Sequence, residues 1–251
     1  MVKQGMRILR NIFQVSGIPF GYATHGPIGD NVFAVKGDNV IVLVDCGGSL
    51  EELEVIDEWL KYWDLINYPV SNVLICHAHN YHMGNAHVFR NRGAKIVAGF
   101  DDAECIETGD YRVIDSGPFK LRQYNPCIVD QKVKDGDIIE SGGLRFEVIS
   151  VPGHTPGSTI YKLALDGKII LFTGDALKVG PECRGSVLGW TGSAGYNRQQ
   201  YFESIKRVSK MHADVILPSE YQICLRDGWK ILQDSYLRAL LEWRQPAEYD
   251  D

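Results

Sequence analysis

The sequence predicts an α+β fold in which two β-sheets pack face to face and helices cover their outer faces. Apolar, β-branched runs occur in both halves of the 251-residue chain, as in strands that are covered on both sides. In each half, further segments carry apolar residues at helical spacing. No Pro-, Gly- or Ser-rich linker separates the halves, so we expect residues 1–251 to form a single domain.

The first half of the chain is expected to supply one sheet and two helices. Residues 39–45 form a continuous β-branched run, typical of a central strand, and the turn signal Asp45-Cys46-Gly47-Gly48 ends it. Ser49 can then cap a helix over 51–63. The expected strands are 7–16, 19–25, 31–35, 39–45, 72–76 and 95–98, and the expected helices are 51–63 and 83–91.

The second half resembles the first in kind. A tight turn at Asp166-Gly167 joins two of its strands. The expected strands are 144–150, 159–164, 168–173 and 214–218, and the expected helices are 198–211 and 227–243. Segments 100–131 and 180–197 have no clear period, so we expect irregular excursions there, the first with room for one short helix.

Composition and charge exclude several classes of protein. The hydrophobic content of 45% is ordinary for a globular protein, and no apolar run reaches the ~18 residues of a membrane span. The net charge of −6 disfavours a nucleic-acid-binding surface. We therefore expect a protein that acts on a small molecule, without a nucleic-acid or membrane partner. The sequence makes no prediction of oligomeric state.

The cysteines and the first residues indicate the compartment. The six cysteines form no CxxC pair, and the chain does not open on the apolar core of a signal peptide. We therefore expect reduced thiols in a cytoplasmic protein.

The stretch from Cys76 to His82 holds three histidines just after an apolar strand. Imidazole is the commonest metal ligand in proteins and binds in its neutral form. In an extended segment, His77 and His79 point the same way and can bind one ion, while His82 faces a neighbouring position. The cluster therefore predicts a metal site at the end of strand 72–76.

Three further polar residues follow other strands. His154 lies in the stiff loop Pro152-Gly153-His154-Thr155-Pro156-Gly157, and Asp175 ends a buried strand, where a carboxylate packs poorly but is a good hard ligand. Glu220 comes just past strand 214–218. It fits equally well as a ligand or as a solvated carboxylate in a loop.

Together these motifs resemble those of the metallo-β-lactamase superfamily. The family pattern is His-x-His-x-Asp-His, then a distant Gly-His, then an Asp after a Gly, and a final His. The chain has His77-Ala78-His79-Asn80-Tyr81-His82, Gly153-His154 and Gly174-Asp175 in that order, and Asp45-Cys46-Gly47 matches the family's first motif. The resemblance implies a four-layer αβ/βα sandwich with the site at one edge between the sheets.

The resemblance also implies a dinuclear centre. His77, His79 and His154 would form one metal site, and His82 and Asp175 the second, with Asp175 bridging the two divalent ions. Zinc is the first expectation for both ions, with iron or manganese as alternatives.

Two positions depart from the family pattern. Tyr81 stands where the motif has Asp, and Glu220 stands where the final His is expected. One carboxylate is lost and one is gained, so two anions still balance two divalent cations, and the oxygen-richer second position suits iron or manganese at least as well as zinc. Tyr81 either donates a hydrogen bond to a substrate oxygen or fills the space left by the missing ligand.

The resemblance implies a metal-dependent hydrolase of an ester, thioester or lactone, in which an activated water attacks the carbonyl carbon. Asp175 and Tyr81 are the expected catalytic residues. Trp190, Tyr196 and Tyr221 are expected to contact the substrate, since their segments should approach the site.

Two other hypotheses remain open at this point. One is a mononuclear iron enzyme that oxidises sulfur, similar to persulfide dioxygenases, with His77, His154 and Asp175 as ligands. The other is a non-catalytic descendant that binds a metal or ligand.

Overall fold

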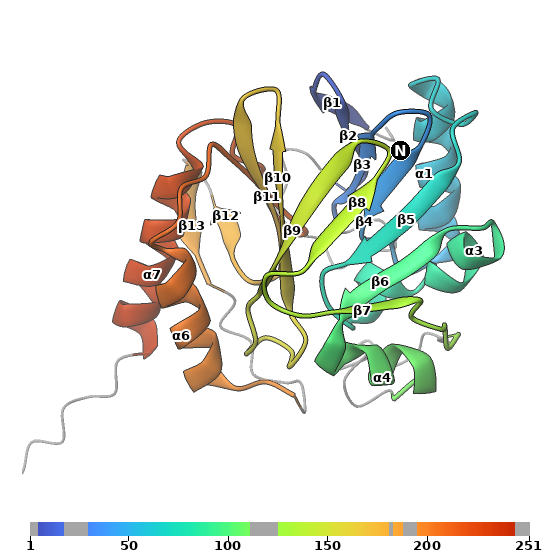
Figure 1. The fold of residues 1–251 in the computed structure, drawn as a ribbon. Coiled ribbons are helices and arrows are strands. Elements are labelled where there is room, and N and C mark those ends of the chain that lie inside the picture. The colour runs from blue at the N-terminus through green and yellow to red at the C-terminus, as the bar shows by residue number, and fades with distance from the viewer. Residues whose placement is uncertain (1–4, 18–29, 111–124, 181–182, 188–194, 244–251) are drawn as a thin grey trace, which may run out of the picture.

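The computed structural model describes residues 5–17, 30–110, 125–180, 183–187 and 195–243. Two β-sheets face each other, and helices lie on the outer side of each sheet (Figure 1). The sandwich predicted from the sequence is confirmed.

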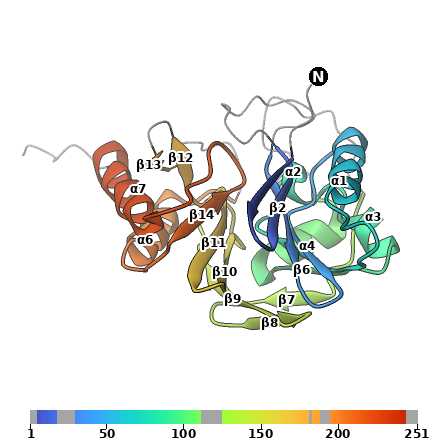
Figure 2. The ribbon, with the colours of Figure 1, turned by 90° about the horizontal axis from the view of Figure 1, so that it is seen from above.

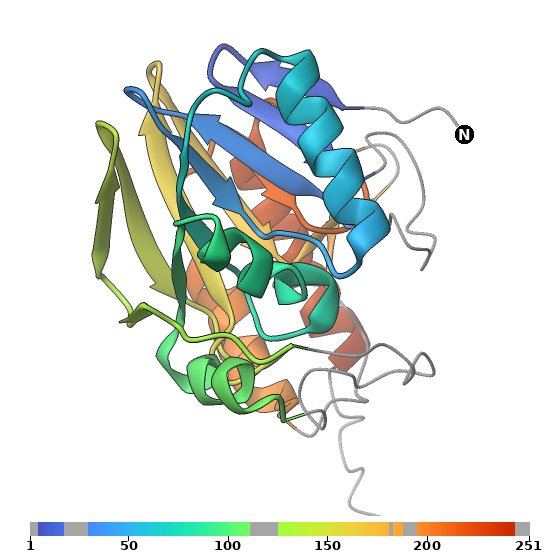
Figure 3. The ribbon, with the colours of Figure 1, turned by 90° about the vertical axis from the view of Figure 1, so that its right-hand side faces the viewer.

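The first sheet holds seven strands in chain order. They are β1 (Met6–Leu9), β2 (Ile12–Ser16), β3 (Val32–Lys36), β4 (Ile41–Val44), β5 (Val70–Ile75), β6 (Lys95–Gly99) and β7 (Gln131–Val133). Strands β1 to β4 pair antiparallel, and β4 to β7 pair parallel. The outer helices of this half are α1 (Leu50–Tyr62), α2 (Asn80–Met83), α3 (Ala86–Asn91) and α4 (Phe100–Thr108). Figure 3 shows them in front of the first sheet.

The second sheet has five strands in the order β14-β11-β10-β9-β8. Their bounds are β8 (Ile138–Ser141), β9 (Leu144–Ser150), β10 (Thr159–Leu165), β11 (Lys168–Gly174) and β14 (Val215–Pro218). A separate ribbon joins β12 (Lys178–Gly180) to β13 (Arg184–Ser186), and the helices α6 (Arg198–Val208) and α7 (Gly228–Trp243) cover the outer face (Figure 2). No helix in the described part of the chain combines the length and the apolarity that crossing a membrane requires.

Three apolar clusters hold the four layers together. The middle one lies between the sheets, where the rings of Phe33 and Phe172 pack 5.7 Å apart. The other two lie between each sheet and its own helices. Neighbours along β3 alternate between clusters, since Phe33 belongs to the middle cluster and Ala34 to the helix side. This alternation follows from the two-residue repeat of a strand.

Local predictions about turns and caps are confirmed. The Ser49 hydroxyl accepts a hydrogen bond from the Glu52 N–H at the start of α1. Asp166 and Gly167 have φ of 51° and 73° and join β10 to β11, as a two-residue hairpin turn requires.

Several expected boundaries are wrong. The strand expected over 7–16 is a hairpin, because the chain turns at Arg10, whose carbonyl accepts hydrogen bonds from the Arg7 guanidinium. The turn has no Gly or Pro that would reveal it. The strand expected over 19–25 lies outside the described residues.

The helix expected over 83–91 is broken into α2 and α3. The break is at Asn85, whose side-chain amide donates to the carbonyl oxygens of Cys46 and Ser49. The Asn85 backbone N–H also donates to the Gly47 carbonyl oxygen at 3.0 Å, in place of a helical hydrogen bond.

The two segments expected to be irregular contain regular structure, and α4 is the one short helix for which the first of them had room. Helix α4 starts directly at the end of β6, and its buried Asp102 hides its amphipathic pattern. Strand β7 covers the last residue of the first segment, and β13 lies within the second. Strand β8 was not expected.

The strand directions bring the polar motifs to one edge of the sandwich. Strands β4, β5 and β6 are parallel, so the residues after them, Asp45, His77 and Asp102, lie at the same end of the first sheet. Strands β11 and β14 are also parallel, so Asp175 and Glu220 follow them at one end of the second sheet.

Candidate metal centre

Three histidines and one aspartate converge at this edge. His79 Nδ1 lies 3.0 Å from His77 Nε2 and 3.1 Å from His154 Nε2. Asp175 Oδ2 lies 3.6 Å from the Nε2 atoms of both His77 and His154. All four ligand atoms are within 4.8 Å of one another, and all four residues are buried. Ligand atoms around one tetrahedral ion at ~2.1 Å are about 3.4 Å apart, so the arrangement fits one metal ion.

Glycines with positive φ bring the two sheets' contributions together. Gly174 has φ of 53°, and a Cβ there would lie 2.6 Å from Cys76 Cβ. Gly153 has φ of 134°, and a Cβ there would overlap the backbone nitrogen of Tyr201. A larger residue at either position would separate Asp175 or His154 from the cluster.

A buried carboxylate braces the loops that carry these histidines. Asp102 Oδ2 accepts hydrogen bonds from the Ala78 N–H at 2.8 Å and from the Thr155 hydroxyl at 2.7 Å. Asp102 Oδ1 accepts from the Gly157 N–H at 2.6 Å. One side chain therefore fixes the segment of His77 and His79 against the loop of His154.

The protonation states suit metal binding. Burial lowers the pKa of His77 and His79, and the neighbouring imidazoles add to this effect. Burial also lowers the pKa of His154, to about 4. All three imidazoles are therefore neutral near pH 7, which is the form that binds a metal.

The aspartate has the complementary property. Burial alone would raise the pKa of Asp175, but the imidazoles of His82, His154 and His79 lower it, so this side chain is an anion. Asp175 Oδ1 is buried and has no hydrogen-bond partner within the described part of the chain. An orphaned carboxylate oxygen beside three neutral imidazoles is what a divalent cation would satisfy.

We call the four-residue cluster the first half of the centre, and His82 with the carboxylates around it the second half. His82 Nδ1 lies 2.9 Å from Asp45 Oδ2, and its Nε2 lies 3.5 Å from Asp175 Oδ2. Burial alone would lower the pKa of His82, but the carboxylates of Asp175 and Asp45 outweigh it and raise the pKa. Asp45 also accepts hydrogen bonds from the Cys76 N–H and the Ser219 hydroxyl, so it braces this half as Asp102 braces the first.

Glu220 lies near Asp175 and His82. Glu220 is partly buried, and this burial together with the Asp175 carboxylate raises the pKa of Glu220 to about 7. Tyr81 is partly buried on α2, between His79 and His82. The expected roles of both residues, Glu220 as ligand and Tyr81 as hydrogen-bond donor, stay predictions.

Sequence reasoning missed Asp30. It is 6% exposed, and its Oδ2 lies 3.8 Å from His82 Nε2. Burial raises the pKa of Asp30, the His82 imidazole opposes this, and the carboxylates of Glu220 and Asp175 reinforce it. Asp30 precedes an antiparallel strand, whereas the search for ligands considered residues that follow strands. The only signal was an Asp-Asn pair before an apolar run.

The structure describes two of the three residues that were expected to contact the substrate. Trp190 lies outside the described residues. Tyr221 adjoins Glu220, and Lys178 Nζ lies 4.7 Å from the centre of its ring. Tyr196 packs 6.2 Å from the ring of Tyr201, and its hydroxyl is buried without a partner among the described residues. Contact of these residues with a substrate stays a prediction.

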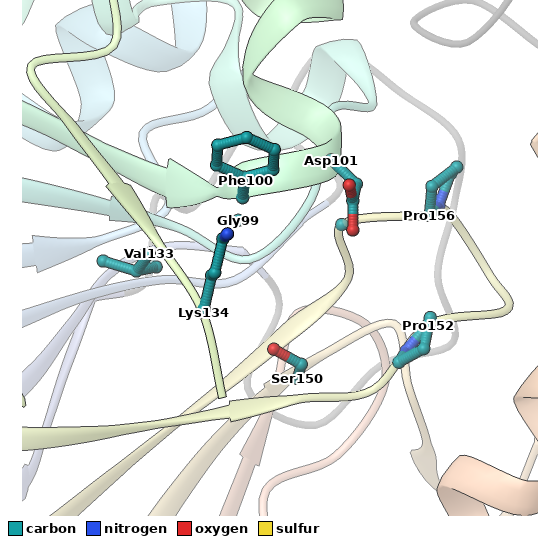
Figure 4. Close-up of a pocket in the computed structure, with 9 residues that line it drawn as sticks. Gly99, Phe100, Asp101, Val133, Lys134, Ser150, Pro152 and Pro156 are labelled. Atoms are coloured by element: carbon teal, nitrogen blue, oxygen red, sulfur yellow. The ribbon is translucent and has the colours of Figure 1, made fainter. Parts of the chain in front are cut away.

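The loop that carries His154 also lines a cavity of about 310 Å³ (Figure 4). Lys134 Nζ lies 4.3 Å from the ring centre of Phe100 on one side of this cavity, and Ser150 and Pro152 lie on the other. None of the four clustered ligands lines it, so it is separate from the candidate metal centre.

The family assignment follows from the fold, the ligand cluster and a sequence profile. The profile of the metallo-beta-lactamase superfamily matches residues 25–220, more than half of the chain. The chain belongs to the metallo-beta-lactamase superfamily. Members of this superfamily are mostly metallohydrolases that bind divalent metal ions.

Curated relatives in this superfamily have low identity to the chain. An uncharacterized protein of Aquifex aeolicus is 28% identical over 191 residues, which are 73% of this chain and 79% of that protein. A hydroxyacylglutathione hydrolase of Photobacterium profundum is 31% identical over 55% of this chain and 43% of its own length. Another, of Serratia proteamaculans, is 25% identical over 80% of this chain and 62% of its own length. The chain therefore spans less than two thirds of these two hydrolases.

Solved metallo-beta-lactamases share the fold. The structure of BJP-1 of Bradyrhizobium japonicum, a subclass B3 metallo-beta-lactamase, has a TM-score of 0.68 and 23% identity, covering 86% of this chain and 77% of that one. A variant of FEZ-1 from Legionella gormanii has a TM-score of 0.72 and 19% identity, covering 95% and 94%. At these identities the likeness concerns the fold alone.

Proposed function

We propose that this protein is a metal-dependent hydrolase of thioesters or closely related esters and lactones. The observation that carries the proposal is the convergence of His77, His79 and His154 on the Asp175 carboxylate. Apolar residues would pack this interior better than buried, neutral imidazoles beside an ionised carboxylate, whereas such a set resembles the ligands of a catalytic metal ion.

The substrate class is supported by relatives named for their activity. The hydroxyacylglutathione hydrolases of Photobacterium profundum and Serratia proteamaculans are thioester hydrolases. Their similarity to this chain is partial, so the proposal extends to the bond that is broken and not to the particular acyl or thiol group.

His77, His79 and His154 would hold the first ion, and His82 with Asp175 the second, as the family pattern implies; we add Glu220 to the second. A divalent ion supplies Lewis acidity there and lowers the pKa of water toward about 7. Three imidazoles suit zinc, and the carboxylate-rich second half suits iron or manganese as well.

The protein's own groups orient the reactants. Asp175 Oδ2 lies 3.5 to 3.6 Å from the Nε2 atoms of His77, His82 and His154, and we assign it to accept a hydrogen bond from the attacking water. The Tyr201 hydroxyl donates to the carbonyl oxygens of Asp175 and Ala176 and keeps this carboxylate in position.

In the reaction, the water oxygen bonds to the acyl carbon and the carbon–sulfur bond breaks. The products are a carboxylic acid and a thiol, which take up the two protons of the water. We assign Tyr81 to donate a hydrogen bond to the developing oxyanion. In the variant Tyr81→Phe we expect a lower kcat and an unchanged metal content.

Metal analysis combined with a thioester assay tests the proposal. We expect two metal ions per chain after purification without added metal, and hydrolysis of an S-acyl thiol that stops on chelation and returns when metal is restored. One iron per chain with oxygen consumption on a persulfide would favour the sulfur-oxidising alternative. Metal-free protein whose properties do not change in His77→Ala would favour a non-catalytic descendant.

A further inference from the structure

Asp30 faces His82 Nε2, a ring nitrogen outside the first ligand set. His82 Nε2 lies 3.5 Å from Asp175 Oδ2 and 3.8 Å from Asp30 Oδ2. The other nitrogen of His82 is engaged with Asp45 at 2.9 Å. His82 is therefore held with Nε2 directed at two carboxylates that come from different sheets.

Asn31 explains why Asp30 is held there. The Asn31 N–H donates to the carbonyl oxygen of Ser219 at 2.6 Å, and its side-chain amide donates to the carbonyl oxygens of Pro218 at 2.9 Å and Tyr221 at 3.3 Å. These bonds tie the start of β3 to the segment on both sides of Glu220. Asp30 and Glu220 are thus neighbours although they are far apart in sequence.

Asn31 is itself fixed from the first sheet. The Gln14 side-chain amide donates to Asn31 Oδ1 at 2.7 Å, and both residues are buried. The position of Asp30 is therefore set by the buried hydrogen bonds of its neighbour Asn31 and not by contacts at the protein surface.

The buried carboxylates of Asp30 and Asp175 face one imidazole, that of His82. Among the described residues, no lysine or arginine forms an ion pair with Asp30 or with Asp175, and both are more than nine-tenths buried. Asp175 Oδ1 has no hydrogen-bond partner in that part of the chain. Buried carboxylates crowded around a single imidazole are costly unless a cation binds among them.

We propose that Asp30 supplies the carboxylate that Tyr81 does not, so that the second metal position consists of His82, Asp175, Asp30 and Glu220. This set has one nitrogen and three carboxylates, whereas the first position has three imidazoles. Hard oxygen ligands favour hard ions, so the preference for zinc over manganese is smaller at the second position than at the first. The inference rests on the proposed function in one respect, because it takes the three imidazoles as the site of the first ion.

Metal titration of the apo protein tests this assignment without any catalytic assay. Chelator-treated protein is titrated with MnCl2 or ZnCl2 by calorimetry, with free Mn²⁺ measured by electron paramagnetic resonance. We expect two sites in the wild-type chain, with zinc's advantage over manganese at least ten-fold smaller at the second. In Asp30→Asn we expect that second site to weaken at least ten-fold while the first is unchanged.

The control is Asp64→Asn, the same chemical change at an exposed residue just beyond the end of α1. Asparagine tolerates a positive φ such as the 54° found at position 64, so both metal sites of this variant should bind as in the wild type. Thermal unfolding of apo Asp30→Asn checks the fold, and Glu220→Gln provides a second variant of the same site.

The outcomes separate this inference from the proposed function. Wild-type affinity at both sites in folded Asp30→Asn overturns the role of Asp30 and leaves the hydrolase intact. A single site of the three-imidazole type in the wild-type chain overturns the inference together with the second ion of the proposed function, and it leaves the three-histidine site in place. If neither metal binds to the wild-type chain, both proposals fail.

Discussion

The two halves of the candidate metal centre are built on the same plan with different candidate ligands. In each half, a buried aspartate that follows a first-sheet strand braces the neighbouring ligand residues by hydrogen bonds. Asp102 does so for the segments of His77 and His154, and Asp45 does so for His82. The first half presents three imidazole nitrogens, and the second presents one imidazole among carboxylates. The comparison teaches that the two bracing aspartates work with either type of ligand set. A ligand can therefore come from a different element of the fold while the backbone held by these aspartates is kept.

Removing one ligand from each half should have the largest effect. His79 Nδ1 lies within 3.1 Å of both other first-half nitrogens, so His79→Ala leaves that half with an incomplete ligand set. We expect kcat/KM for a thioester to fall at least about 1,000-fold, with the first ion lost. In His82→Ala we expect the first ion to stay and the second to be lost.

Metal content measured by mass spectrometry beside the kinetics checks this pair. Equal metal loss in both variants would mean that the halves form one indivisible site, contrary to the comparison.

The brace of the first half should matter for folding as well as for binding. In Asp102→Asn, the side-chain amide turns its own N–H groups toward N–H and O–H groups that donate to the carboxylate in the wild type. We expect the free energy of unfolding to fall by roughly 3 kcal/mol, because buried hydrogen bonds to a charged group are lost. Urea unfolding of the apo protein measures the change.

The neighbouring residue offers a matched control for this prediction. Asp101 is exposed, so Asp101→Asn should stay within about 0.5 kcal/mol of the wild type. A similar loss in both variants would show that the charge at the start of α4 matters and not the brace.

The brace of the second half should affect only its own ion. Asp45 has φ of 59°, a conformation that Asn also adopts, so Asp45→Asn changes the charge without straining the backbone. His82 then loses the carboxylate that orients it, and we expect the second ion to bind 10- to 100-fold more weakly, since outer partners of metal ligands have effects of that size. Calorimetric titration measures it, and weakening of the first ion by the same factor would contradict separate braces.

The first half of the centre could be predicted from the sequence because its ligands lie in short motifs. His77 and His79 directly follow an apolar strand, and Gly153-His154 and Gly174-Asp175 carry glycines that the backbone requires. The strands and the face-to-face sheets were predictable for a related reason. Buried strands form continuous apolar runs.

The second half could be predicted only in part because it depends on tertiary contacts. Asp30 reaches His82 through the hydrogen bonds of Asn31 to the segment around Glu220, 187 to 190 residues away. No local pattern marks such a pair. The same holds for the break between α2 and α3, which follows from bonds of Asn85 to residues before α1.

The smallest effect concerns a distant support of the first half. Asp135 accepts hydrogen bonds from the Arg207 guanidinium and from the Ser150 N–H, which ties α6 to the strand leading to His154. The Arg207 guanidinium lowers the pKa of Asp135. Because the pKa is lower in the folded state, the stabilisation is complete above the unfolded value of about 4 and is lost as the pH falls through the folded value. Both side chains are about half exposed, so in Asp135→Asn we expect less than about 1 kcal/mol of lost stability at pH 7 and no change in metal content. Urea unfolding at pH 7 and below pH 4 measures the difference, which should shrink at the lower pH; a constant difference would show that the ion pair is not its source.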